Sequence, residues 1–232
     1  MFDPKKYYRI SLSNLVEQPL KQFGFKFFDK NSICRMTDDE VFQSISFIKS
    51  RYGGENFKVE ISIRPMYCPH DDYLTSMPGN SLRSMATKSD ENWNYSTETD
   101  GHKSFKEIVE LKDKYALPIL NSTKDSVEII SCYERNIFRQ RKFGNKILWG
   151  TQGWENFDFG HIYLRAGDKA KSIRQFKKCF REFNSDKRDW AQVAAKDCLK
   201  IIEIIKQGDN YIKQYLVDII VALFNYFNNF QT

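Results

Sequence analysis

The sequence predicts an α+β fold, in which an antiparallel meander of about four strands is covered by helices and followed by an all-helical C-terminal module. Residues 57–65 alternate apolar and polar side chains without a break, which is the period of a strand with one buried face. Residues 41–49 are rich in β-branched and aromatic side chains, and the Gly53-Gly54 pair between the two stretches predicts a hairpin. Helical periodicity dominates from about residue 147 onward.

One helix and two short strands are predicted upstream of this hairpin. Apolar residues at helical spacing predict an amphipathic helix over 12–23, kinked at Pro19 and ended by Gly24. Strands over 25–28 and 33–36 follow between polar turns, and strands joined by short turns usually pair as neighbours. In the second strand of the hairpin, the predicted core face carries Phe57, Val59, Ile61 and Ile63. The face predicted to meet solvent carries Lys58, Glu60, Ser62 and Arg64.

A long polar segment follows the sheet. The hydrophobic pattern disappears over 68–101, which predicts a loop. Two aromatic side chains are candidates to anchor this loop on the sheet, Trp93 and Tyr95. A helix containing residues 105–111 is predicted to end before Pro118. Another is predicted after Ser122–Asp125, which fits a capping box and completes a first domain over residues 1–138.

A basic connector over 139–146 leads to a predicted helical module over 147–232. Within it, residues 159–180 resemble one tetratricopeptide helical hairpin, with Ser172 in place of the usual alanine. The positions that carry this likeness are Gly160, Tyr163, Gly167, Asp168, Ile173, Phe176 and Cys179. A solenoid needs about three repeats, and the chain shows no second copy, so the sequence predicts a single hairpin.

Two more helices are predicted, over 187–207 and 210–229, and the last is apolar on nearly all sides. Its unbroken apolar run, 219–224, is far shorter than the roughly 20 residues that span a bilayer, so no membrane anchor is expected. A helix this apolar either packs inside the helical module or forms the contact of a homodimer.

The composition indicates a folded chain with a basic middle third. Of the residues, 41% are hydrophobic and 15% aromatic, which is enough for a core and excludes a disordered chain. Residues 117–183 hold 13 Lys and Arg against 7 Asp and Glu, whereas the segments before and after are balanced at 17 against 17 and 6 against 6. The opening residues show no export signal, so a cytoplasmic location is expected. The five scattered cysteines predict buried thiols and neither disulfides nor a metal knuckle.

Common catalytic and cofactor motifs are missing from the sequence. It lacks the P-loop, the dinucleotide fingerprint, the nucleophile elbow and the HExxH zinc motif, so we expect no cofactor, no metal and no enzyme of those classes. The alternative is a hydrolase-type enzyme with a site between the sheet and the 68–101 loop, where Cys68–Asp72 combines four potential ligands in five residues. Its candidate residues are Arg64, Glu60, His70 and Asp71. The Gly53-Gly54 tip, beside Lys49 and Arg51, could instead hold an anion.

A basic stripe is the strongest electrostatic feature. Its residues recur at spacings of three and four along one predicted helix: Lys171, Arg174, Lys178 and Arg181. The connector could extend it through Arg139, Arg141 and Lys142. Like charges at this spacing repel on an isolated helix, so an acidic protein partner is one hypothesis for the stripe, and a merely solvated face is its alternative. Nucleic acid is disfavoured because no aromatic residues are interleaved with the cations. The predicted function is therefore non-catalytic protein binding, for example in an immunity or antitoxin-like protein.

Five motifs occur in order in the first two-thirds of the chain: GFKFF at 24–28, VFQSISFIKS at 41–50, YGG at 52–54, FKVEISIRP at 57–65 and ALPIL at 116–120. With these motifs, residues from about 10 to 140 resemble the bacterial family known as domain of unknown function 4304. Ile48 stands where that family tends to have Gln. The resemblance implies an α+β domain and a bacterial origin, and it brings no established activity or catalytic residue.

Overall fold

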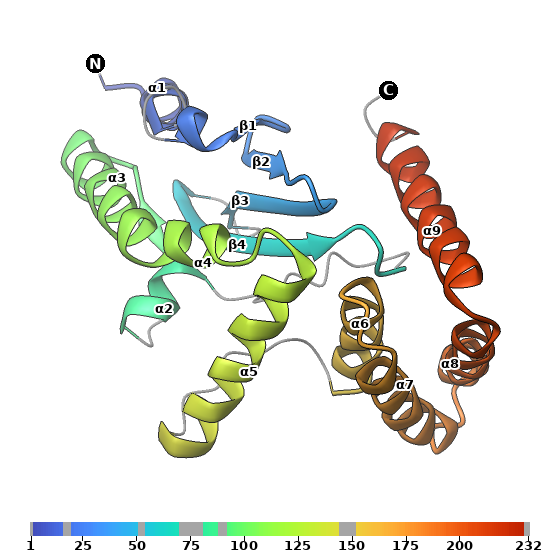
Figure 1. The fold of residues 1–232 in the computed structure, drawn as a ribbon. Coiled ribbons are helices and arrows are strands. Elements are labelled where there is room, and N and C mark those ends of the chain that lie inside the picture. The colour runs from blue at the N-terminus through green and yellow to red at the C-terminus, as the bar shows by residue number, and fades with distance from the viewer. Residues whose placement is uncertain are drawn as a thin grey trace. The chain divides into compact units, whose positions relative to one another are not determined.

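The computed structural model confirms the predicted fold class, an antiparallel sheet with helices followed by an all-helical region (Figure 1). It describes residues 2–15, 20–50, 54–69, 81–87, 92–143 and 152–229, apart from the side chains of 136–143, 152 and 226–229. The chain forms two compact units: Met1–Thr37, Phe42–Ile63 and Ser76–Ser122 in the first, and Asp38–Val41, Arg64–Thr75 and Thr123–Thr232 in the second. The predicted domains, 1–138 and 147–232, stay a prediction.

The first unit is built on a five-stranded sheet, in which each strand pairs with the next along the chain (Figure 1). The strands are β1 (Lys26–Phe27), β2 (Ser32–Met36), β3 (Val41–Lys49), β4 (Asn56–Pro65) and β5 (Trp93–Asn94). The first four are those predicted. The fifth pairs with the start of β4, placing Trp93 opposite Phe57. It was not predicted because two residues are too few to show a strand period.

The apolar face of β4 forms the core as predicted, since Phe57, Val59, Ile61 and Ile63 are fully buried. The prediction for the opposite face is only half right. Lys58 and Glu60 are partly exposed, but Ser62 and Arg64 are buried. The strand is therefore covered on both sides towards its C-terminal end, a condition that alternation of residue types alone does not reveal.

The N-terminal helix lies earlier than predicted. Helix α1 spans Pro4–Leu15, and a short 3-10 helix, η2 (Lys21–Phe23), ends at Gly24 with a φ of 81°. Asp3 starts α1, because its side chain accepts hydrogen bonds from the amides of Lys5 and Lys6 at 3.0 and 3.1 Å. The Asp-Pro pair at 3–4 is a helix-start signal that the apolar spacing obscured. Pro19 and its predicted kink lie outside the described residues.

Two helices and an aromatic cluster pack against the sheet. Helix α3 (Glu98–Leu111) places Phe105 against Tyr8 of α1 and against Phe57 of β4, with ring centroids 5.9 and 5.8 Å apart. Trp93 and Tyr95 also contact Phe57, so the polar segment is anchored on the sheet as predicted. That segment is not all loop, because it contains α2 (Leu82–Thr87) as well as β5.

Helical structure continues past the predicted end of α3. A π-helical turn, η3 (Lys112–Ala116), leads into α4 (Leu117–Asn121), and Pro118 is tolerated because it lies in the first turn of α4. Helix α5 (Ser126–Phe143) begins where predicted, but with a different capping box. Asp125 accepts the amide of Glu128 at 2.8 Å, and Glu128 accepts the amide of Lys124 at 2.7 Å.

A buried arginine ties the sheet to the end of α4. Arg35 of β2 is 7% exposed, and its guanidinium donates to the backbone oxygens of Phe23 and Leu120 and to the side chains of Gln43 and Asn121, at 2.7–3.0 Å. Gln43 also donates to the oxygen of Leu120, at 2.8 Å. Because a buried charge without partners is costly, this network requires all five residues to hold their positions.

The second unit contains α5 and four further helices, α6 (Gln152–Arg165), α7 (Lys169–Asn184), α8 (Asp189–Gln207) and α9 (Asp209–Asn229). Successive helices pack as neighbours, with α6 and α7 side by side (Figure 1). Helices α6 to α9 match the predicted hairpin and the two helices after it. The turn before β3 also belongs to this unit. There, Asp39 and Glu40 accept hydrogen bonds from Arg165 at 2.9 and 2.6 Å.

The α6–α7 hairpin is closely packed around Gly160. A Cβ at this position would lie 2.6 Å from the ring of Phe176, so only glycine lets the helices approach this closely. Ser172 donates to the carbonyl of Gly160 at 2.8 Å, which gives the buried hydroxyl a partner. The serine that departs from the tetratricopeptide pattern is thus accommodated by a hydrogen bond across the hairpin.

Replacing Arg35 by Met should destabilise the first unit. Arg35→Met leaves Phe23 and Asn121 without their donor, so the free energy of unfolding should fall by about 2–4 kcal/mol. Lys103→Met, at an exposed site of α3, is the matched control and should change it by less than about 0.5 kcal/mol. Urea titration would measure both values, and equal losses would contradict a role for the network.

Replacing Gly160 by Ala tests the close approach in the second unit. The added methyl group should lower the free energy of unfolding by about 1–3 kcal/mol. Gly to Ala within an unstrained helix would instead raise it by about 0.5–1 kcal/mol. The loss should be smaller when Gly160→Ala is made in a Phe176→Leu background, because the ring that clashes is gone. A cost that is unchanged in the double variant would show that the clash is not its cause.

Candidate functional site

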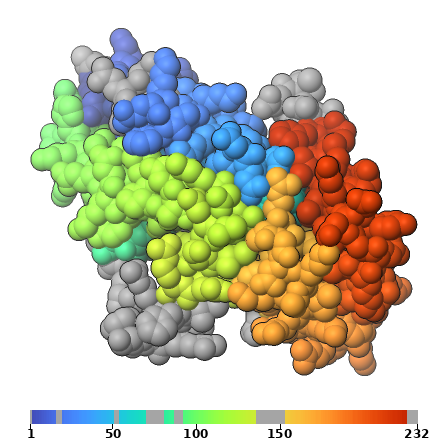
Figure 2. Space-filling model, in the orientation of Figure 1, coloured from blue at the N-terminus to red at the C-terminus, as the bar shows by residue number. Residues whose placement is uncertain are grey.

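Helix α7 positions the predicted basic stripe. Its N-terminus is capped by Asp168, whose carboxylate accepts the amide of Lys171 at 2.9 Å. The buried face of the helix carries Ser172, Phe176, Cys179 and Phe183. Because basic residues occupy half of the remaining twelve positions, the amphipathic pattern fixes which side of α7 is cationic. Figure 2 shows the α6–α7 hairpin, in orange, at the surface of the face that is drawn.

The two lysines at the start of α7 are used within the fold. Lys171 donates to Glu134 at 3.1 Å, and its ammonium lies 5.2 Å from the ring centroid of Tyr163. Lys169 pairs with Asp209 at 2.6 Å. Lys171 was predicted as part of the partner-binding stripe, but its charge already has a partner. Because this ion pair is half exposed, the role predicted for Lys171 in partner binding stays a prediction.

The C-terminal part of the stripe is different. Arg174, Lys177, Lys178 and Arg181 are all exposed, and none of the four forms an ion pair with a carboxylate in the described part of the chain. Arg181 donates only to the carbonyl oxygen of Lys177, at 3.2 Å. The prediction omitted Lys177, although the adjacent Lys177-Lys178 pair in the sequence could have drawn attention to it. These four residues are called the α7 cationic face below.

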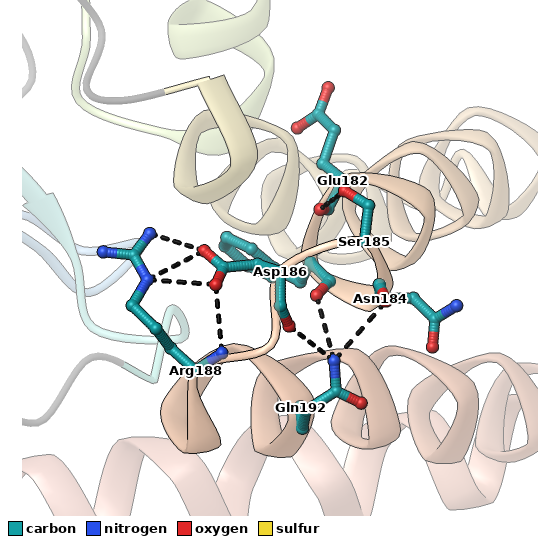
Figure 3. Close-up of polar contacts among 7 residues, drawn as sticks. Glu182, Asn184, Ser185, Asp186, Arg188 and Gln192 are labelled. Carbon is teal, nitrogen blue, oxygen red and sulfur yellow. Dashed lines mark hydrogen bonds and ion pairs between the residues drawn. The ribbon is translucent and has the colours of Figure 1, made fainter.

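The turn after α7 holds this face in place (Figure 3). The side-chain amide of Gln192 donates to the carbonyl oxygens of Phe183, Asn184 and Asp186, at 3.4, 3.5 and 2.6 Å. Arg188 donates to both carboxylate oxygens of Asp186, and these hydrogen bonds lower the pKa of Asp186. Two of the last carbonyls of α7, those of Phe183 and Asn184, therefore accept from the Gln192 side chain of α8, which helps to fix the direction in which α7 leaves the hairpin.

Acidic residues lie on the side of α7 that faces α6. Glu182 accepts hydrogen bonds from Asn156 at 3.1 and 3.2 Å. Glu155 of α6 accepts a hydrogen bond from the hydroxyl of Tyr133. Burial raises the pKa of Glu155, and the negative charges of Glu182 and Asp158 add to the increase. The positive charge of Lys178 acts on the pKa of Glu155 in the opposite direction, so this part of the α7 cationic face lies within electrostatic reach of the carboxylates.

The predicted extension of the stripe falls on residues whose side chains the structure does not describe. Arg139, Arg141 and Lys142 lie in the backbone of α5, but their side chains are outside the described residues. The alternative enzyme site is likewise described only in part. Arg64 is buried and Glu60 partly exposed on β4, whereas His70 and Asp71 fall outside the described residues.

Cysteine positions agree with the predicted buried thiols. Four cysteines are buried and Cys132 is partly exposed, and all five remain thiols. Burial raises the pKa of Cys68, and its thiol donates to the carbonyl oxygen of Asp158 at 3.7 Å. Such a thiol is a poor nucleophile and a poor metal ligand. Within the described ranges, no three His, Cys, Asp or Glu residues gather in a way that could hold a metal ion.

Helix α9 is partly buried and partly exposed. One face is buried through Ile212, Leu216, Ile219, Ile220 and Leu223, as expected for a helix inside the module. Another face exposes Val217, Val221 and Phe224, which recur at helical spacing. A homodimer through α9 remains a proposal, with these three side chains as its contact. No described helix combines the length and apolar character needed to cross a membrane.

The structure defines an α+β unit and a second unit that is mainly helical. Residues 16–122 match the model of one family, described as domain of unknown function (DUF4304), so the resemblance seen in the sequence is confirmed over this segment. The matched residues include β1 to β5, α3 and α4. No curated protein and no solved structure matches the chain.

The raised pKa of Glu155 predicts that removing its charge increases the stability of the folded chain, and that the increase depends on pH. A folded state with a raised carboxyl pKa binds more protons than the unfolded chain, so its stability falls as pH rises through the ordinary carboxyl pKa. Glu155→Gln cannot ionise and should become increasingly more stable than the natural protein between about pH 4 and pH 7. Thermal unfolding at both pH values would measure this. A stability difference that shrinks on going to pH 7 would contradict it.

Proposed function

We propose that this chain is a non-catalytic protein-binding module, and that the α7 cationic face binds an acidic surface of a partner protein. The observation that carries the proposal is the contrast along one helix. Lys169 and Lys171 are paired with carboxylates, whereas Arg174, Lys177, Lys178 and Arg181 are exposed without one in the described chain. Cations held close together on a rigid helix repel, so a negatively charged partner would relieve an existing strain.

The shape of the face favours a protein over a nucleic acid. Of the aromatic residues of α7, Phe176 and Phe183 are buried and Phe180 is only partly exposed, so α7 offers no fully exposed ring among its cations to stack on a base. Four cations on one helical face match a row of carboxylates on a partner helix or strand, and such complementarity mainly provides specificity and fast association. An immunity or antitoxin-like protein, which binds one cognate toxin, would use a surface of this kind. All five cysteines as thiols fit a reducing compartment such as the bacterial cytoplasm, which is the setting we propose.

Charge reversal on α7 should abolish partner recovery. The triple variant Arg174→Glu, Lys178→Glu and Arg181→Glu replaces three cations of the face, and repulsion should reduce recovery of the partner about tenfold or more. The immobilised full chain would be incubated with a nuclease-treated lysate of the cells that encode it. Mass spectrometry would then quantify each protein recovered by the natural chain and by the variant.

A second triple variant controls for net charge. Lys187→Glu, Lys196→Glu and Lys213→Glu change the same number of exposed lysine charges elsewhere in the second unit and should leave recovery nearly unchanged. An acidic protein lost only with the α7 variant would support the proposal. Equal recovery by all three chains would overturn the role of α7. Recovery from a parallel untreated lysate but not from the nuclease-treated one, with a steep dependence on salt, would assign the face to nucleic acid instead.

A further inference from the structure

A cavity of about 610 Å³ lies in the first unit, between α1, the β1–β2 turn and the end of β3. Figure 1 shows α1 beside β1 in this region. The volume is within the range of about 300–1,000 Å³ that is typical of small-molecule sites. Apart from Lys49, which the sequence placed near a candidate anion site at the hairpin tip, no lining residue was predicted to be functional. The tip residues Arg51 and Gly53 lie outside the described residues.

The lining is strongly cationic. Lys5 and Arg9 of α1, Lys30 of the β1–β2 turn and Lys49 of β3 all line the cavity. Asp29 is the one carboxylate among the described lining residues, and its Oδ1 already accepts the amide of Asn31 at 2.6 Å. None of the four cations forms an ion pair with any carboxylate that the structure describes. Four positive charges and one negative charge give the lining an excess of positive charge. This excess suits a ligand with two negative charges, such as a phosphate monoester, better than a ligand with one carboxylate.

Aromatic rings provide the apolar part of the cavity. Phe27 lines it with a ring that is 40% exposed, although a phenylalanine would normally be buried. Tyr8 also lines it and is only 2% exposed. The ammonium of Lys49 lies 4.7 Å from the centroid of the Tyr8 ring. An exposed ring face beside cations is an arrangement that accepts a planar, negatively charged molecule.

The hydroxyl of Tyr8 gives a second, independent indication of a ligand. It is buried and has no hydrogen-bond partner among the described residues. Buried polar atoms are almost always paired, and one left unpaired costs about 1–3 kcal/mol. Burial, with the nearby Tyr95 and Asp29, raises the pKa of Tyr8, so the hydroxyl keeps its proton and can donate. A ligand oxygen that displaced the surrounding side chains and reached this hydroxyl would supply the missing acceptor.

We propose that this cavity binds a small phosphate monoester with a planar ring, such as a nucleotide, its phosphate among Arg9, Lys30 and Lys49 and its ring against Phe27. The site is independent of the α7 cationic face, because it lies in the other unit and uses none of the same residues. The chain would then carry a ligand-binding site in addition to its proposed partner surface.

Isothermal titration of the full chain would test the proposal with three probes: adenosine 5′-monophosphate, adenosine and inorganic phosphate. The nucleotide should bind at least about tenfold more tightly than either part, because both the charge and the ring are needed. Failure of the nucleotide to bind at millimolar concentration would overturn the proposal. If adenosine bound as tightly as the nucleotide, the cavity would be an apolar site only. If inorganic phosphate bound as tightly as the nucleotide, the cavity would be a general anion site. Either result would also overturn the proposal.

Matched variants then locate the binding. Arg9→Glu with Lys30→Glu should weaken nucleotide binding about tenfold or more, whereas Lys103→Glu with Lys106→Glu, exposed on α3 outside the cavity, should not. If both double variants weakened nucleotide binding equally, the effect would come from net charge alone, and the proposed site would be overturned.

Tyr8→Phe separates ligand binding from folding. Removal of an unpaired buried hydroxyl should leave the melting temperature unchanged or higher, yet weaken nucleotide binding about threefold to tenfold. A lower melting temperature with unchanged affinity would show that the hydroxyl serves the fold and would overturn its role in binding. Tyr8→Phe also keeps the proposal testable if the variant that combines Arg9→Glu with Lys30→Glu does not fold.

Discussion

The buried guanidinium of Arg35 is the constraint on which the first unit depends. It joins β2 to segments more than 80 residues away, and it can remain buried only while four acceptors surround it. Three of the motifs that carry the family resemblance meet at this point. Phe25 of GFKFF lies under the guanidinium at 4.5 Å, Gln43 of VFQSISFIKS accepts from it, and Leu120 of ALPIL accepts through its carbonyl. These matched positions therefore hold the fold together.

The first unit depends on a polar network, whereas the second unit depends on the close approach of two helix backbones. Gly160 allows α6 and α7 to meet through the ring of Phe176, and Gln192 of α8 satisfies the end of α7. These contacts fix the side of α7 on which its cations lie, and the charge of Lys178 still acts on Glu155. The placement of these charges follows from packing, which positions residues by volume and leaves the charges where the helix puts them.

Unpaired cations are the feature that the two proposed sites share. Some cations of the described chain are used within the fold, as with Arg165 against Asp39 and Glu40. The α7 cationic face and the cavity each gather four cations that form no ion pair with a described carboxylate. Electrostatic repulsion of this kind lowers the stability of the folded chain and raises its affinity for anions from outside. The two surfaces differ in form, because α7 is convex and suits a protein, whereas the cavity encloses space for a small molecule.

The sequence by itself determined the four long-range features that follow from periodicity: the meander, the buried face of β4, the helical hairpin and the basic stripe of α7. It could not determine features shorter than one period, such as β5, or those governed by a competing local signal, such as the start of α1 at Asp3. Periodicity reports the side on which a residue lies, and says nothing of what covers it.

Only the tertiary structure decided which charges are paired. The sequence treated Lys171 and Arg174 alike, yet the fold brings Glu134 to the first and leaves the second exposed. The cavity is a stronger example, because Arg9, Lys30 and Lys49 are far apart in the chain and meet only when α1 lies beside the sheet. Charge pairing depends on distances of a few ångströms between distant segments, and those distances are set by packing of the apolar faces.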